Sequence, residues 1–229
     1  MGEVISVISG KGGTGKTTVC AAVASCLAAE GSRVLCIDAD IGLRNLDIAL
    51  GMAELPVLAF TEVLDGNFTL MDATAHPELD KLFLLTAPSR AGDRSVSPAA
   101  FAMLLHDARE QFDYVLIDSA AGIGDSFRLA TDSADRCVIV CTSDPACLRD
   151  AACTADLLEL RGHRDVSLVV NRVNPKMFSR MKLTVDDIMD TVGLPLLGLV
   201  PEDAEVVLAA AQGTALIFAA EDGAAEACL

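Results

Sequence analysis

Short apolar runs alternate with longer segments of helical periodicity along the chain. Between the first two runs, residues 17–30 place Val19, Val23 and Cys26 on one helical face, and Gly31 follows the last turn. The apolar runs, expected to be strands, are 4–9, 33–38, 82–85, 114–118, 137–142, 166–171 and 196–200. Further helices are expected at 98–111, 148–160, 184–192 and 203–212, and an exposed loop at 89–97. This alternation predicts an α/β fold, with a doubly wound, mostly parallel sheet flanked by helices in one domain over residues 1–229.

The composition supports a sheet that is buried on both faces. Hydrophobic residues make up 52% of the 229 residues, yet the chain has one Tyr and no Trp, so Ala, Val, Leu and Ile must build the core. Lys and Arg total 17 against 33 Asp and Glu, for a formal net charge of -16, without a run of basic residues. Such a surface repels nucleic acid and anionic lipid.

The N-terminus and the cysteines favour a cytoplasmic protein. The first strand begins at residue 4, which leaves no room for a signal peptide, and no stretch approaches the ~20 apolar residues of a membrane span. The eight Cys include no C-x-x-C pair, and most lie in apolar runs. We interpret them as small buried hydrophobic residues rather than as disulfide partners or metal ligands.

The loop after the first strand has the G-x-x-x-x-G-K-[ST] spacing of a phosphate-binding loop. Its glycines let backbone N–H groups approach phosphate oxygens, and the following helix adds the positive end of its dipole. Lys16 is expected to reach the β- and γ-phosphates of ATP, and the Thr17 hydroxyl to hold Mg²⁺. The residues expected to bind nucleotide are Gly10, Lys11, Gly12, Gly13, Thr14, Gly15, Lys16, Thr17 and Thr18.

Acidic residues follow two other predicted strands. Asp38 and Asp40 end the second strand, and Asp118 ends the run 114–118 in the manner of a Walker B aspartate. At the phosphate end of a parallel sheet, such carboxylates can hold Mg²⁺ or orient an attacking water. A strand-end Asp that only caps the next helix is the simpler alternative for an isolated Asp-x-Asp.

The run Lys11-Gly12-Gly13-x-Gly15-Lys16-Thr17-Thr18 resembles the deviant Walker A motif of the MinD/ParA family. The resemblance implies an ATP-dependent homodimer in which Lys11 crosses to the partner's nucleotide. Residues 36–47 are similar to the first switch of the MinD branch of that family. That likeness implies that Asp40 positions the hydrolytic water and that Asp38 supports the magnesium shell. Lys11, Lys16 and Asp40 are thus the expected catalytic residues, and Thr17, Asp38, Asp40 and Asp118 the expected metal site.

Residues 119–124 resemble the second switch of that family, with two departures. Gly122 keeps the position where a backbone amide meets the γ-phosphate, but Ala120 stands for a Pro and Gly124 for an acidic residue. We expect a more mobile loop and altered partner contacts there. Asp144 stands where the family has a Glu, in a segment associated with the dimer interface.

Residues at the ends of two of the predicted strands are expected to flank the adenine base of ATP. Asn171, followed by Arg172, could read the adenine edge, and Pro201 begins a loop that resembles the family's second base-flanking loop. Taken alone, each also fits an ordinary strand end followed by a helix cap.

The resemblance runs from residue 2 to about residue 218. Family members continue into a basic amphipathic helix that lies on the membrane, whereas residues 221–229 here are acidic and small, without Lys or Arg. Either the chain has been truncated before that helix, or the protein does not bind membrane by the family's route, and the sequence is consistent with both. A missing C-terminal helix, if restored, would place it at the inner face of the membrane.

The leading hypothesis is an ATPase of the MinD type, which dimerises with ATP, acts in septum placement and is reset by hydrolysis, with MinC-like and MinE-like regulators. A ParA-like or flagellar-number ATPase is the alternative, although DNA binding would need surface Lys and Arg. A redox or metal-insertion relative would need a Cys in the second switch, where 119–124 has none. A catalytically silent nucleotide-binding scaffold also stays open, against the presence of Lys11 and Asp40.

Overall fold

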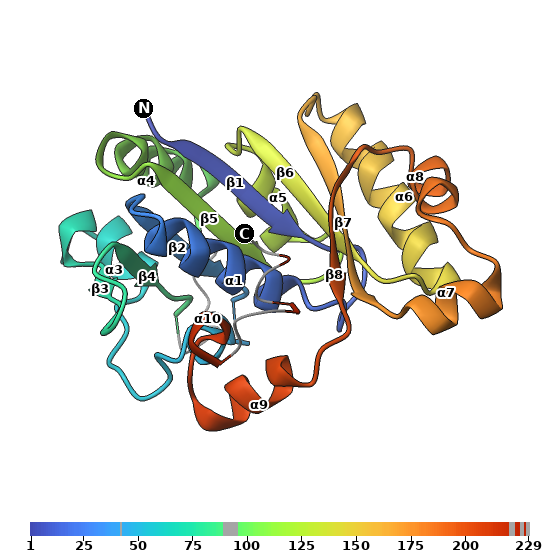
Figure 1. Cartoon of the computed structure of the whole chain (residues 1–229). Coiled ribbons are helices and arrows are strands. Elements are labelled where there is room, and N and C mark those ends of the chain that lie inside the picture. Colours follow the sequence, from blue (N-terminus) through green and yellow to red (C-terminus); the bar gives the residue numbers. More distant parts are fainter. Residues whose placement is uncertain (42, 89–95, 220–222, 225–226, 228–229) are drawn as a thin grey trace.

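The computed structural model describes residues 1–41, 43–88, 96–219, 223–224 and 227 of the chain. Its centre is an eight-stranded sheet of order β3-β4-β2-β5-β1-β6-β7-β8 (Figure 1). The β3–β4 pair is antiparallel, and the other neighbouring pairs are parallel. The strands are β1 (Glu3–Ile8), β2 (Val34–Ala39), β3 (Thr74–Ala75), β4 (Leu82–Leu85), β5 (Tyr114–Ser119), β6 (Arg136–Cys141), β7 (Val166–Val173) and β8 (Leu196–Pro201).

The predicted α/β architecture is confirmed, and all seven predicted strands form with ends shifted by at most two residues. The sequence did not predict β3, because two residues are too few to show an alternating pattern. The predicted loop at 89–97 falls largely on residues 89–95, which lie outside the described residues, as does most of the acidic tail at 221–229.

Helices cover the sheet, and the longer ones match the prediction. They are α1 (Lys16–Ala29), α2 (Leu46–Ala49), α3 (Phe60–Leu64), α4 (Pro98–Gln111), α5 (Asp125–Thr131), α6 (Pro145–Leu160), α7 (Pro175–Met181), α8 (Val185–Val192), α9 (Glu205–Gln212) and α10 (Leu216–Ala219), with a 3-10 turn η1 at Leu70–Asp72. Helix α6 begins three residues before its predicted start, because the Asp144 side chain accepts from the Cys147 amide and Pro145 occupies the first turn. The short helices α2, α3, α5, α7 and α10 were not predicted.

Alternating strand residues face two layers of helices. Cys36 belongs to the core cluster that contains the inner face of α1, together with residues of α9 and α10. Its neighbour Ile37 belongs to the opposite cluster, with Phe101 of α4. Further along the sheet, Ile139 packs with Leu148 of α6. Among the described helices, none has the combined length and hydrophobicity that a bilayer crossing requires.

The carboxyl ends of β1, β2 and β5 meet at one edge of the sheet. Asp38 of β2 pairs in register with Asp118 of β5, and Asp118 pairs on its other side with Val7 of β1. The loop that follows β1 therefore emerges beside both carboxylates. Ligands of open α/β sheets bind beyond this edge.

Candidate functional site

The loop between β1 and α1 closes tightly against β7. Gly13 and Gly15 adopt positive φ angles of 79° and 87°, which glycine tolerates without strain. A Cβ at Gly15 would lie 2.1 Å from Nδ2 of Asn171. That nitrogen donates a hydrogen bond to the Thr14 carbonyl at 2.8 Å. Asn171, expected from the sequence to read a base, thus also holds this loop in place.

A cavity of about 450 Å³ opens over the loop. The Thr14 hydroxyl is buried there and has no hydrogen-bond partner among the described residues. Because an unsatisfied buried hydroxyl is costly, its presence beside this cavity, which Lys16, Thr17 and Asp40 also line, indicates a ligand site. The residues that line the cavity include Gly12, Gly13, Thr14, Gly15, Lys16, Thr17, Thr18, Asp40, Leu43, Asn45, Ala121 and Arg172.

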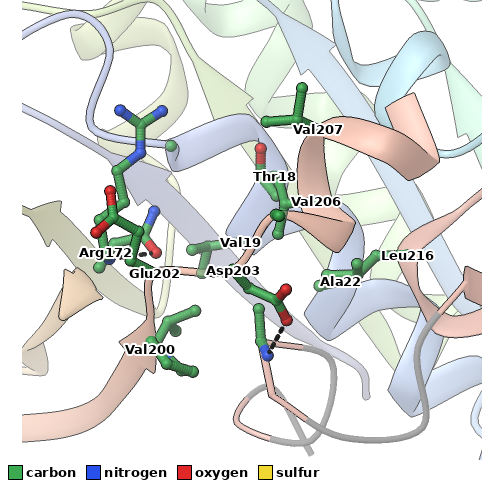
Figure 2. Close-up of a pocket in the computed structure, with 15 residues that line it drawn as sticks. Thr18, Val19, Ala22, Arg172, Val200, Glu202, Asp203, Val206, Val207 and Leu216 are labelled. Atoms are coloured by element: carbon green, nitrogen blue, oxygen red, sulfur yellow. Dashed lines mark hydrogen bonds between the residues drawn. The ribbon is translucent and has the colours of Figure 1, made fainter. Parts of the chain in front are cut away.

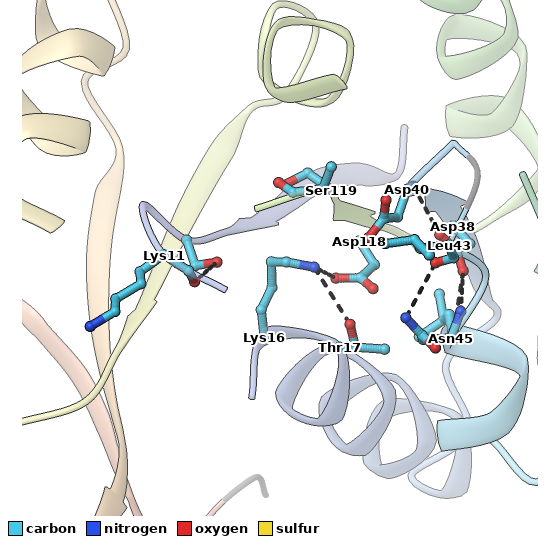
Figure 3. Close-up of polar contacts among 12 residues, drawn as sticks. Lys11, Lys16, Thr17, Asp38, Asp40, Leu43, Asn45, Asp118 and Ser119 are labelled. Carbon is cyan, nitrogen blue, oxygen red and sulfur yellow. Dashed lines mark hydrogen bonds and ion pairs between the residues drawn. The ribbon is translucent and has the colours of Figure 1, made fainter. Parts of the chain in front are cut away.

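Lys16 and Asp118 form a buried ion pair below the cavity (Figure 3). The Nζ of Lys16 lies 2.5 Å from Oδ1 of Asp118, and the side chains are 7% and 1% exposed. The same Nζ donates to the Thr17 hydroxyl at 3.5 Å. Burial raises the pKa of Asp118, whereas Lys16 and Thr17 act in the opposite direction. The three residues that the sequence predicted at the phosphates and the metal therefore lie together.

Asp38 organises the backbone of the loop that follows β2. Its Oδ1 accepts from the Asp40 amide at 2.9 Å, and its Oδ2 accepts from the amides of Asn45 and Leu46 at 3.2 and 3.1 Å (Figure 3). Burial raises the pKa of Asp38 to about 6. The charge of Asp118 raises this pKa further, and the hydrogen bonds from the backbone amides lower it. Asp38 was predicted to support a magnesium shell, but no signal in the sequence pointed to this positioning of the loop.

Asp40 is half-buried and lines the cavity over the phosphate loop. Burial raises the pKa of its carboxyl group, and the nearby Lys16 ammonium lowers it. A carboxylate held beside a phosphate cavity in this way can accept a hydrogen bond from water.

The second switch is closed onto the loop that follows β1. Gly122 has a φ of 91°, and its amide donates to the Ser9 carbonyl at 3.0 Å. In this conformation the amide that was predicted to meet the γ-phosphate is therefore already satisfied. Gly124 precedes the first residue of α5 as its N-cap, without a side chain that could cap the helix, and Ala120 lies at the start of the same turn.

Lys11 points away from Lys16 and from the three carboxylates of Asp38, Asp40 and Asp118 (Figure 3). Its Nζ lies 3.2 Å from Oδ2 of Asp144, and the two side chains are 47% and 52% exposed. The hydrogen bond from Lys11 helps to lower the pKa of Asp144, after the larger effect of the Cys147 amide, and Asp144 raises the pKa of Lys11. The loop lysine is thus held by the residue that caps α6.

A second cavity, of about 580 Å³, lies between α1, β7, β8 and α9 (Figure 2). It shares Gly15, Thr18 and Arg172 with the cavity over the phosphate loop. The predicted base-flanking residues Asn171, Arg172 and Pro201 all line it. Its walls are largely apolar, as a nucleoside requires. They include Val19, Ala22, Val200, Val206, Val207 and Leu216.

Two features of this second cavity were not predicted. Arg172 has a φ of 55°, an uncommon conformation for a residue with a side chain, at a register shift between β7 and β8. Asp203 accepts from the amides of Glu205 and Ala224, so a residue distant in sequence closes one wall (Figure 2). The sequence offered no signal for either feature.

The described cysteines are free, and all except Cys153 are buried. Burial raises the pKa of Cys137 and Cys141 to about 12, which keeps both thiols protonated. Among the described residues, no group of three or more His, Cys, Asp or Glu is placed to hold a metal ion by itself.

The comparisons with known proteins point in one direction. Residues 5–217 match the family model of the CobQ/CobB/MinD/ParA nucleotide binding domain. The chain is 36% identical over 220 residues to the septum site-determining protein MinD of Synechocystis, covering 95% of this chain and 83% of that protein.

Solved structures of MinD proteins are similar to this chain over nearly its whole length. The MinC:MinD cell division protein complex of Aquifex aeolicus contains a chain with a TM-score of 0.91 and 33% identity, covering 99% of this chain and 92% of that one. MinD of Pyrococcus horikoshii complexed with Mg-ADP has a TM-score of 0.85 and 27% identity, covering 100% and 93%. The chain therefore belongs to the MinD/ParA family of nucleotide-binding proteins, and within it to the septum site-determining ATPases of the MinD type.

Proposed function

We propose that this chain binds Mg-ATP, pairs with a second copy while ATP is bound, and is reset by hydrolysis. The observation that carries the proposal is the buried Lys16 at the base of a cavity that adjoins a second, apolar cavity of nucleoside size. The triphosphate would lie over the loop and the adenosine in the apolar cavity. The glycine-rich loop, Lys16 and the N-terminus of α1 follow one another, and a helix N-terminus favours an anion such as a phosphate, which supports this orientation.

Asn171 is the residue that selects the base in this proposal. Its amide has used one N–H on the Thr14 carbonyl and one lone pair on the Arg172 amide. One donor and one acceptor remain, which matches the donor and acceptor on the edge of adenine. Arg172 and Pro201 would flank the sugar and the base.

The oxygen donors at the loop suit Mg²⁺. Thr17 and Asp40 line the phosphate cavity, and the Asp118 carboxylate lies behind them against Lys16. These oxygens are too few to enclose a cation alone. Mg²⁺ prefers such partial sites, which it completes with phosphate oxygens and water. When bound, it would neutralise phosphate charge. Asp38 would contribute by holding the Asp40 segment, because its oxygens already accept three amides.

Asp40 would orient the water for hydrolysis. The water oxygen forms a bond to the γ-phosphorus while the bond from that phosphorus to the bridging oxygen breaks, which gives ADP and phosphate. Asp40 accepts a hydrogen bond from the water and Lys16 stabilises the charge on the phosphates.

Lys11 would act in the dimer. For its ammonium to reach a second nucleotide, the ion pair with Asp144 must open. Because both groups are exposed, the pair is weak and screened by salt, so its opening is compatible with a switch.

Two variants test this function. Lys16→Ala removes the counter-charge to the phosphates, and calorimetry should show that ATP binding is lost. Asp40→Ala should keep ATP binding but stop hydrolysis, so size exclusion with light scattering should give a dimer with Mg-ATP and a monomer with Mg-ADP. A monomer in both nucleotides would contradict the role of Lys11, and hydrolysis at the parent rate would contradict that of Asp40.

A MinC-like protein is the proposed partner of the ATP dimer, with a MinE-like protein as the regulator that stimulates turnover. The MinC:MinD complex of Aquifex aeolicus supports the first of these. Biolayer interferometry with a MinC protein should show binding to the Asp40→Ala dimer and none to the ADP-bound monomer.

We place the protein in the cytoplasm, where its free cysteines stay reduced.

A further inference from the structure

Residues of α3, of α4 and of the segment 68–70 line a groove. Figure 1 shows where α3 and α4 lie, near the β4 side of the sheet. The groove has a volume of about 600 Å³ and shares no lining residue with the two nucleotide cavities. Phe68 and Met103 are 47% and 69% exposed at its walls. The other apolar residues of the groove are Val63, Leu64, Leu70, Ala100 and Leu104.

Helix α4 presents two different stripes. Phe101, Leu105 and Ala108 are buried against the sheet. Met103 and Asp107 line the groove instead, one helical turn apart. An exposed Met on a groove-facing stripe is a flexible apolar contact that adapts to a partner's shape.

The open end and the rim of the groove are acidic. Asp107 and Glu110 are exposed and form no ion pair with any residue that the structure describes. Across the groove, the Asp72 carboxylate accepts from Thr69, which is itself a lining residue. The groove is lined by no Lys or Arg of the described chain. Glu110 also lines a neighbouring hollow with Arg33 and Arg109, without a described ion pair to either, and Asp107 lines the groove only. Carboxylates without an ion pair beside apolar walls favour a cationic, amphipathic occupant.

We propose that this groove binds a short amphipathic helix of a partner protein, with an apolar face over Phe68 and Met103 and Lys or Arg beside Asp107 and Glu110. The 14 residues of α4 span ~21 Å, which matches about four turns of a partner helix laid alongside. The acidic rim disfavours nucleic acid and anionic lipid as occupants.

The test uses the full chain and a synthetic peptide with leucines at helical spacing and lysines elsewhere. Fluorescence anisotropy measures binding, and methyl signals of ¹³C-labelled methionines locate it. The Met103 signal should shift, while that of Met177 on α7 should not. Asp107→Lys/Glu110→Lys should weaken binding by about tenfold or more, since two charge contacts become repulsive. The matched control is Asp156→Lys/Asp190→Lys, which changes the net charge equally at two exposed positions on α6 and α8 and should bind as the parent does.

Several results would overturn the proposal. Equal weakening in the control pair, or equal binding of a peptide with glutamates in place of lysines, would indicate general charge attraction. A Met103 signal that shifts with protein concentration alone would indicate a second copy of this chain in the groove. Met103→Asp adds a check on the apolar contact, and retained peptide affinity in that variant would count against the groove. Thermal unfolding of each variant is measured in parallel as the sign of correct folding, and a failure of the parent chain to bind ATP would bear on the nucleotide site alone, because the groove shares no lining residue with it.

Discussion

Replacing Asp38 by Asn removes one buried charge while it keeps the shape of the side chain. The carboxylate is fully buried beside Asp118 and accepts three backbone amides. Burial raises its pKa from 3.8 to about 6, and the amides only partly offset this. Between these two values the folded protein binds more protons than the unfolded chain, so ionisation of Asp38 makes the folded state less stable as pH rises through the window.

The magnitude follows from the shift in pKa. About two pKa units correspond to ~3 kcal/mol of lost stability once pH is well above 6. Of this, about 1.4 kcal/mol is lost between about pH 5 and about pH 7.5. Asn cannot ionise, but its NH₂ group must face at least one backbone N–H, which costs ~1–3 kcal/mol at every pH. The parent and Asp38→Asn should therefore differ more in the pH dependence of their stability than in their mean stability.

Urea unfolding in the absence of nucleotide and Mg²⁺ measures the effect. Between the two pH values the parent should lose ~1.4 kcal/mol of unfolding free energy relative to Asp38→Asn. Asp190→Asn, an exposed carboxylate on α8, is the control and should follow the parent. Parallel curves for the parent and Asp38→Asn would refute the raised pKa.

Three further predictions use other contacts of the site and the core. Asp144→Asn keeps the cap of α6 but weakens the hold on Lys11, so the ATP-dependent dimer should form at several-fold lower protein concentration in light scattering; an unchanged dimer would mean that this contact does not restrain Lys11. Gly15→Ala places a Cβ 2.1 Å from Asn171 Nδ2 at a φ of 87°, so it should cost ~1–3 kcal/mol of stability and abolish ATP binding; near-parent affinity would contradict the tight closure. Burial lowers the pKa of His76, so stability should fall as pH drops below 6.5 towards that lowered pKa, and His76→Gln should lose this part of the slope in thermal unfolding.

The parts that were predictable from sequence are those with strong local signals. The buried strands are continuous apolar runs, and α4 has apolar residues at helical spacing. Helix α1 is apolar on nearly every side, and its start is marked by the spacing of Gly15, Lys16 and Thr17, which is that of a phosphate-binding loop. The resemblance to a family contributed the expectations for Lys11 and Asn171. Short helices such as α2 were not predicted, because four residues carry too little pattern and the first amide of α2 is fixed by Asp38, which lies outside the helix.

Contacts between distant segments account for the rest. Nothing in the sequence shows that Lys11 meets Asp144, that the Gly122 amide donates to Ser9, or that Asn171 clamps the loop. The partners in these three pairs are 133, 113 and 157 residues apart in the sequence, so only the folded sheet brings them together. Local propensity cannot encode such pairs, although Lys11, Gly122 and Asn171 themselves were candidate site residues.

Lys16 and Asp118 satisfy each other's charge in the structure. Lys16→Ala alone therefore removes the phosphate ligand and also leaves a buried carboxylate without its partner, which costs ~3–5 kcal/mol in comparable buried pairs. Lost ATP binding in that variant could then follow from a weakened fold. In the double variant Lys16→Ala/Asp118→Asn the uncompensated charge is gone, so urea unfolding should recover most of that stability while calorimetry still detects no ATP binding. If the double variant is no more stable than Lys16→Ala, the ion pair does not stabilise the fold, and if it binds ATP, Lys16 is not the main phosphate ligand.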